Sequence, residues 1–215
     1  MVSFIDHIVV GAFELEKAKV SLEKKFGVPF SEVGRHDLMA TKNRLLRMQG
    51  NSYLELISVD SLATTNRPRW FSLDSNETKK ALTKEPKALA WVVSVENILH
   101  TKNNCGFETG RIIKMKRGKF EWKLTVPDDG SLPEGGILPV LIEWSDELNP
   151  SHALVKSGVF LEKILIKHPD KERIDGILRR LNIQAEITVE IGPKNFCFHL
   201  RSEKGRRVIW CKDGI

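Results

Sequence analysis

The sequence predicts an α+β protein made of repeated modules, each with one strand, one helix and three further strands (βαβββ). Such modules form curved mixed sheets around a cup. Three observations lead to this prediction: the order of elements occurs three times, short apolar runs flank each helical pattern, and 215 residues suffice to bury a core. We expect two modules in residues 1–150 (about 3–60 and 87–146) and a third in residues 155–215.

The first module opens with an apolar strand over residues 5–10, which a helix over residues 14–26 follows. Gly27 is placed to end this helix, and Pro29 prevents its continuation. The helical pattern rests on the spacing of Leu15, Ala18, Leu22 and Phe26. Three strands are expected next, around 30–34, 43–48 and 53–59.

The same order returns twice. The second module has strand, helix and three strands at 88–95, 96–104, 110–115, 120–126 and 138–144. The third has them at 160–167, 169–181, 185–191, 196–201 and 207–210. Residues 60–86 are rich in Ser, Thr, Asn and charge, which predicts a surface segment with a short helix around 77–82. A four-stranded sheet with one helix leaves a face uncovered, so we expect two modules to sit side by side and share a core.

Composition argues against several classes of protein, among them nucleic-acid-binding, membrane-spanning and disulfide-rich proteins. The net charge is +6, but basic and acidic residues are interleaved, and the basic runs at 114–117 and 204–207 are typical of hairpin turns. Without interleaved aromatic residues, these runs do not favour a nucleic-acid partner. We expect no signal peptide, no membrane span and a cytoplasmic location, since no apolar stretch approaches the roughly 20 residues that a span needs. Three cysteines without CxxC spacing argue against a disulfide framework or a structural zinc site.

Two charged residues stand within apolar strands, His7 near the first strand's start and Glu55 in the last strand of the first module. Burying a carboxylate is costly unless it is paired or coordinated. If both side chains face the cup, they form a pair suited to a divalent metal. The structural alternative for His7 is a hydrogen-bonded residue without a role as ligand, and for Glu143, in the last strand of the second module, it is a salt bridge at a strand end.

Arg35, His36 and Asn43 lie near the second and third strands and are candidates for positioning a substrate. Arg35 would bind a carboxylate or another oxyanion, and His36 would act as acid or base near neutral pH. The alternative is a loop that packs on the rim. Trp91 and Trp144 are expected to line the cup or to fill the core. Nucleotide-dependent chemistry and serine hydrolysis are disfavoured, because GxGxxG, P-loop, GxSxG and HExxH motifs are missing.

A family resemblance adds to this interpretation. The phrases DHIVV at 6–10, GRH at 34–36 with TKNRLL at 41–46, and YLELI at 53–57 resemble the glyoxalase-like domain family of the vicinal-oxygen-chelate superfamily. The phrase GGILPVLIEW at 135–144 resembles that family's second segment. The resemblance spans roughly residues 4–150. It implies metal ligands from the first and last strands of two paired modules.

Carried over residue by residue, the resemblance implies His7, Glu55 and Glu143 as metal ligands. The fourth position falls near Trp91, which cannot bind a metal.

Two functions are compatible with these residues. The first is an enzyme of lyase, isomerase or dioxygenase type that acts on a small substrate with two adjacent oxygens. It would use Zn, Mn, Fe or Ni and no organic cofactor, and Glu143 or His36 would move the proton. The second is a non-catalytic protein that binds or sequesters a small molecule. We expect a homodimer, because the odd third module leaves a sheet to be covered.

Overall fold

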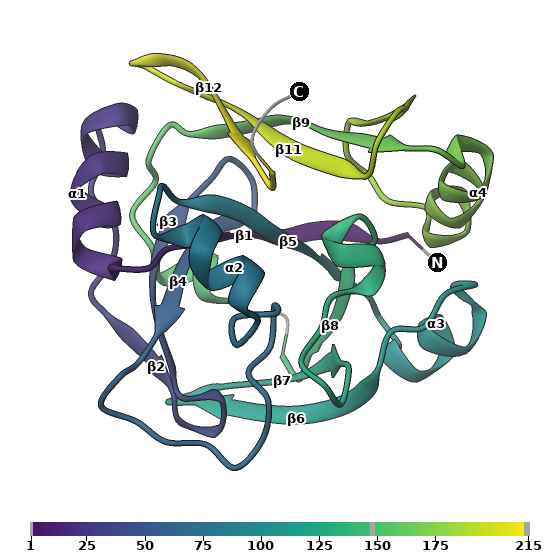
Figure 1. Cartoon of the computed structure of the whole chain (residues 1–215), viewed down its shortest axis with the longest axis horizontal. Coiled ribbons are helices and arrows are strands. Elements are labelled where there is room, and N and C mark those ends of the chain that lie inside the picture. The colour runs from purple at the N-terminus through teal and green to yellow at the C-terminus, as the bar shows by residue number, and fades with distance from the viewer. Residues whose placement is uncertain (1, 147–148, 213–215) are drawn as a thin grey trace.

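The computed structural model describes residues 2–146 and 149–212. Its larger sheet has eight strands in the order β2-β3-β4-β1-β5-β8-β7-β6 and curves into a nearly closed cup, and a separate four-stranded sheet lies across the outside (Figure 1). This is the α+β architecture that the sequence predicts. None of the helices in these residues is long and apolar enough to cross a membrane.

Each of the three modules has the strand–helix–three-strand order. Module one contains β1 (Phe4–Gly11), α1 (Leu15–Phe26), β2 (Gly34–His36), β3 (Thr41–Arg47) and β4 (Tyr53–Val59). Module two contains β5 (Lys87–Ser94), α3 (Ile98–Asn104), β6 (Arg111–Arg117), β7 (Phe120–Val126) and β8 (Val140–Trp144). Module three contains β9 (Phe160–His168), α4 (Lys171–Leu181), β10 (Ile187–Ile191), β11 (Asn195–Ser202) and β12 (Gly205–Trp210). The connections add α2 (Asn76–Leu82) and three 3-10 turns, η1 (Asp37–Met39), η2 (Pro133–Gly136) and η3 (Pro150–Ala153).

The end of α1 follows from local chemistry. Gly27 ends the helix with a φ of 77°, a left-handed conformation that favours glycine, and its N–H bonds to Glu23 O. The strand expected around 30–34 begins only at Gly34; before it, Phe30 N–H bonds to the Glu23 side chain and Ser31 N–H bonds to Leu45 O of β3. This shift moves His36 into the sheet.

Modules one and two join through β1 and β5, which pair antiparallel at the centre of the large sheet. In each of the two modules, the first strand pairs parallel with the last, β1 with β4 and β5 with β8. Each module therefore supplies one half of the cup, and the two halves mirror each other in strand order.

Module three keeps the order of elements but changes their pairing. Its strand order is β10-β9-β11-β12, and β10 lies parallel to β9, so that α4 is the crossover of a βαβ unit. The last strand, β12, pairs only with β11 in this sheet. The sequence pattern identified the strands of this module but not their partners.

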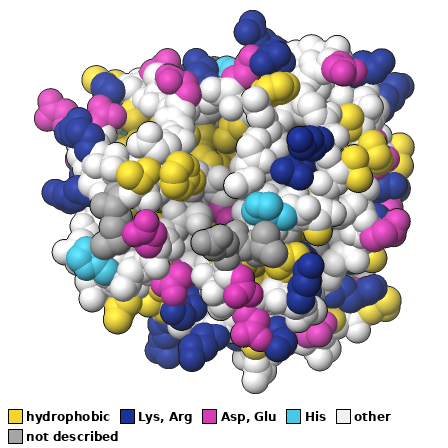
Figure 2. Space-filling model, turned by 180° about the vertical axis from the view of Figure 1, so that it is seen from behind, with side chains coloured by type: hydrophobic (Ala, Val, Ile, Leu, Met, Phe, Trp, Pro, Cys, Tyr) yellow, Lys and Arg dark blue, Asp and Glu magenta, His cyan; other side chains and the backbone are white. Residues whose placement is uncertain are grey.

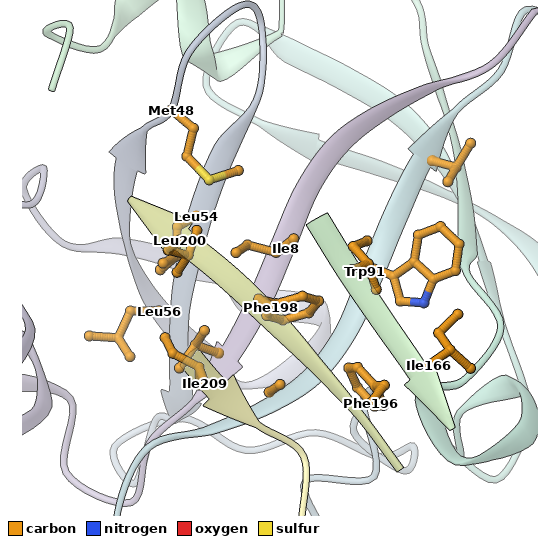
Figure 3. Close-up of a cluster of buried hydrophobic side chains, with 14 of the residues drawn as sticks. Ile8, Met48, Leu54, Leu56, Trp91, Ile166, Phe196, Phe198, Leu200 and Ile209 are labelled. Atoms are coloured by element: carbon orange, nitrogen blue, oxygen red, sulfur yellow. The ribbon is translucent and has the colours of Figure 1, made fainter. Parts of the chain in front are cut away.

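Side-chain alternation on β1 and β5 separates two cores. Ile8 and Trp91 point out of the cup, where they pack against Phe196 and Phe198 of module three (Figure 3). All four of these side chains are fully buried. Other side chains of the same strands, such as Val92, point into the cup. The sheet of module three thus packs against the outer face of the cup.

The positive charge forms no single patch on the face seen in Figure 2, where Lys and Arg side chains lie among Asp and Glu side chains. The three cysteines are free thiols, with Cys105 and Cys197 buried and Cys211 half-buried.

Candidate functional site

The inside of the cup holds a small cavity of about 30 Å³ whose wall combines polar groups with aromatic rings. Imidazole, carboxylate, amide and guanidinium groups meet there, from His7, His36, Glu55, Asn43 and Arg117. Aromatic rings of Tyr53, Trp70, Phe71, Trp122 and Trp144 form much of the wall. Both modules of the large sheet contribute to this site.

His7 and Glu55 come from β1 and β4, which are neighbours in the sheet. Their strands bring His7 Nε2 to 3.7 Å from Glu55 Oε2, with both side chains 7% exposed. Glu55 Oε1 accepts a hydrogen bond of 2.5 Å from Asn43 Nδ2. The same oxygen lies 3.9 Å from His36 Nε2. Glu55 is therefore a buried carboxylate flanked by two imidazoles and oriented by an amide.

Asp6 fixes the ring of His7 from the other side. His7 Nδ1 donates to Asp6 Oδ1 at 2.6 Å, while Asp6 Oδ2 accepts from Trp144 Nε1 at 2.7 Å and Asn149 Nδ2 at 3.2 Å. Because a carboxylate can only accept, Nδ1 carries the proton, and the lone pair of a neutral His7 is on Nε2, toward Glu55. A register shift between Ile5 and His7 in the β1–β5 ladder accompanies this arrangement.

His36 is neutral at physiological pH. Burial is the main reason that its pKa falls to about 4. The charge of Glu55 opposes this shift, while Arg117 and His7 act in the same direction as burial. The Nδ1 atom of His36 contacts Thr41 Oγ1 at 3.2 Å, and its ring meets the ring of Trp70 edge-on at 4.8 Å between centroids.

Tyr53 forms another part of the wall. Its ring stacks on His7 at 4.6 Å, and burial, together with the charges of Asp6 and Glu55, raises its pKa well above 10. The phenol therefore keeps its proton at physiological pH.

Arg117 reaches the cavity from the end of β6. Its Nη1 donates to Asn43 Oδ1 at 3.2 Å, which turns the Nδ2 of that amide toward Glu55. Among the residues that the structure describes, Arg117 forms no ion pair with a carboxylate. The sequence does not single out Arg117, because the 114–117 run is typical of a solvent-facing turn. Asp6 was also missed, although it precedes His7 directly.

The structure brings together five of the residues singled out in the sequence. His7, His36, Asn43, Glu55 and Trp144 all line the cavity. Three of them, His36, Asn43 and Glu55, come from neighbouring strands of module one. Trp144 comes from the last strand of module two, so it closes the cavity from the opposite half of the cup.

Three other residues of the predicted site lie elsewhere. Glu143 points away from the cup: its Oε2 accepts from Ile98 N–H at the start of α3, and its Oε1 pairs with Lys123. Trp91 lies in the outer core, where its Nε1 donates to a backbone carbonyl. Arg35 pairs with an aspartate and does not line the cavity.

The predicted metal set of His7, Glu55 and Glu143 is therefore not assembled. Within residues 2–146 and 149–212, no three His, Cys, Asp or Glu side chains are placed to hold one metal ion. Alternation on the strands of module two turns Val92 and Ile142 into the cup, and these side chains have no donor atoms. The donor set does not fit a resident metal centre.

A cover closes the cup. Trp70 and Phe71, from the connection between modules one and two, are each 3% exposed and line the cavity. In the described part of the chain, the Nε1 of Trp70 is buried without a hydrogen-bond partner. The remaining space holds about one water molecule, so a larger ligand requires part of the cavity wall to move.

Comparison with known proteins adds a family and a fold. A family model described as "Glyoxalase-like domain" matches residues 5–182. A hypothetical protein from Staphylococcus aureus aligns over 100% of this chain and 87% of its own, with 16% identity and a TM-score of 0.58. This likeness shows that the fold is shared along the whole chain. None of the curated proteins matches the sequence.

Two methylmalonyl-CoA epimerases align less well. The one from Mycobacterium tuberculosis covers 70% of this chain and 91% of its own, with 13% identity and a TM-score of 0.42. A variant of the Streptomyces coelicolor epimerase, in complex with 2-nitronate-propionyl-CoA, covers 68% of this chain and 100% of its own, also with 13% identity and a TM-score of 0.42.

Proposed function

The chain belongs to the glyoxalase-like domain family, and on that premise we propose that its cup performs proton transfer on a small oxygen-bearing anion, as an isomerase or lyase does. The observation that carries the proposal is Glu55, a buried carboxylate between two imidazoles, in a cavity that the Arg117 guanidinium also lines. Buried ionisable groups that converge in a cavity are typical of acid–base sites.

Glu55 is the base in this proposal. It removes a proton from the carbon next to a substrate carbonyl or carboxylate; the C–H bond breaks, an O–H bond forms on Glu55, and the electron pair moves to the substrate oxygen. The lone pair on His7 Nε2 faces Glu55 and can accept this proton, with Asp6 stabilising the resulting imidazolium. Returning the proton at a new position completes an isomerisation, and loss of a leaving group completes an elimination.

Two other groups suit the substrate's negative charge. The Arg117 guanidinium, whose Nη1 is held by the Asn43 amide, can bind a carboxylate through two parallel hydrogen bonds. The neutral imidazole of His36 can donate a hydrogen bond to the developing oxyanion without adding a fixed charge.

The metal-dependent version of this chemistry would need ligands from both modules. The cup offers His7 and Glu55 from module one, but Val92 and Ile142 from module two. We therefore base the proposed steps on the side chains of the chain itself.

Deuterium exchange tests the proposal. Small 2-hydroxy, 2-oxo and 3-oxo carboxylates are incubated with the protein in D₂O, and the loss of C–H signal is followed by NMR. We expect exchange in at least one compound, slowed roughly 100-fold or more by Glu55→Gln. Glu143→Gln is the matched control, since it removes a carboxylate from the opposite face of the sheet. Equal rates in the two variants would contradict the role of Glu55.

The aromatic walls favour a second candidate, a non-catalytic small-molecule binding protein. Saturable binding of a compound that depends on Arg117, without exchange in any compound, would support this candidate over catalysis.

A further inference from the structure

A second concavity, separate from the cup, lies between α2 and module three. This groove has a volume of about 850 Å³ and shares no lining residue with the cup cavity. Figure 1 shows α2 in front of β5 and below β11 and β12. The groove is bounded by α2, by the η2 turn and by the start of β11 with the residues after β12. Its size is in the range of small-molecule sites.

The rim of the groove is basic. Its lining contains two glutamates and five lysines, and the lysines come from three separate stretches of the chain: Lys80, Lys84, Lys87, Lys194 and Lys212. Of the two glutamates, Glu134 is shared between Arg173 and Lys194, at 2.8 and 2.6 Å. Lys87 pairs with Glu85 at 2.6 Å, so the exposed Lys80 and Lys212 are the lysines that present positive charge to an incoming ligand.

The floor is apolar. Leu82, Leu89, Ile137 and Phe196 line it from α2, β5, the connection to β8 and β11. A ligand that is only charged would leave this floor unused, and one that is only apolar would leave the basic rim unused. From the two properties together, we propose that the groove binds a small amphipathic anion, with a carboxylate head at the lysines and an alkyl body on the floor.

Cys211 offers a local probe, because it lines this groove and is half-buried, whereas Cys105 and Cys197 are 2% and 0% exposed. Burial raises the pKa of the Cys211 thiol to about 11, so its alkylation is slow enough to follow by mass spectrometry at mildly alkaline pH. A ligand in the groove should shield this thiol.

The experiment measures alkylation of Cys211 by iodoacetamide in the full chain, with and without decanoate. We expect saturating decanoate to slow the reaction about tenfold, because bound ligand protects in proportion to occupancy. Inorganic phosphate and decanol at the same concentration should leave the rate unchanged. Equal protection by decanol would show an apolar crevice without anion selectivity and overturn the proposal. Absence of protection by decanoate would overturn it as well.

A charge-reversed pair tests the lysines. Lys80 and Lys212 are both exposed, and the variant Lys80→Glu/Lys212→Glu should abolish protection by decanoate. The control Lys114→Glu/Lys156→Glu makes the same change in net charge at exposed sites outside the groove and should retain protection. Protection is expressed as the alkylation rate of Cys211 without ligand divided by the rate with ligand. Any change in the intrinsic reactivity of the thiol cancels in this ratio. Full protection in the groove variant would contradict the proposal.

Discussion

The Nε2 atom of His7 lies 3.7 Å from Oε2 of Glu55 inside the cup, on two neighbouring parallel strands. Asp6 holds the opposite ring nitrogen of His7 at 2.6 Å. A carboxylate, an imidazole and a second carboxylate thus lie in series in the wall of the cup. A proton that reaches His7 from Glu55 is stabilised by the charge of Asp6 behind it.

Asp6→Asn should turn an amide N–H toward Nδ1 of His7, because the single amide oxygen is needed as the acceptor for Trp144 and Asn149. We expect proton-transfer activity to fall by about 10²-fold or more, as for other orienting groups of acid–base pairs. Loss of the accepting carboxylate should also destabilise the fold by roughly 1–3 kcal/mol. Nitrogen chemical shifts of His7 provide a readout that a purely structural role would not change: the wild type should show a protonated Nδ1, and the variant a mixed or reversed tautomer.

Arg117→Met should weaken binding of an anionic ligand by about 10- to 100-fold, because it removes the guanidinium from the cavity wall. Titration calorimetry of the variants with the compound found by exchange measures this effect. Arg35→Met is the matched control, since Arg35 pairs with Asp60 outside the cavity. A larger loss from Arg35→Met than from Arg117→Met would reverse the assignment.

The burial of His36 makes stability depend on pH. The pKa of His36 is about 4 in the folded chain and about 6.5 when unfolded, so the unfolded state binds more protons between these values. Its contribution to the free energy of unfolding is therefore present above pH 6.5 and declines as the pH falls toward 4, by about 3 kcal/mol in total. Urea unfolding between about pH 4.5 and 7.5 should show a shallower pH slope for His36→Asn than for wild type. Parallel slopes would contradict a neutral, buried His36.

Trp91 should matter for stability and not for the site. Trp91→Ala is expected to lower the free energy of unfolding by about 3–5 kcal/mol, because the indole is fully buried against module three. Unfolding curves measure this effect. Ligand binding in the cup, measured below the transition, should be unchanged; selective loss of binding at full stability would place Trp91 in the site.

Metal analysis distinguishes metal-dependent chemistry from proton transfer by the side chains alone. We expect well below one divalent ion per purified chain, even after incubation with manganese, zinc, iron(II) or nickel, because the positions of module two that face the cup lack donor atoms. Elemental analysis of wild type, His7→Ala/Glu55→Ala and Glu143→Ala measures this. Near-stoichiometric metal that disappears only in the double variant would establish a metal centre on module one.

The homodimer stays a prediction. The sheet of module three, which the sequence leaves in need of cover, packs on the outer face of its own cup, so a second chain would have to bind another surface. Analytical ultracentrifugation at working concentration measures the mass directly, and a monomeric mass would contradict the dimer.

The threefold order of elements, the family and part of the candidate site can be predicted from the sequence. Short-range periodicity and capping residues such as Gly27 act within a few residues, so they can be recognised along the chain. His7, His36, Asn43 and Glu55 were recognisable because polar residues within or beside apolar strands need partners.

Which side chains share the cup depends on the tertiary structure. The faces of β5 and β8 follow from register and curvature, which place Trp91 and Glu143 outside the cup. They do so although Trp91 and Glu143 lie 52 residues apart, close to the 48 residues between His7 and Glu55. Arg117 meets Asn43 across 74 residues of sequence, a distance over which no local pattern carries information. The pairing of β10 with β9 is likewise not predictable from the sequence, because the strands of module three are similar in composition. Local propensities specify elements, while the partner and the inward face of each strand are fixed by long-range packing.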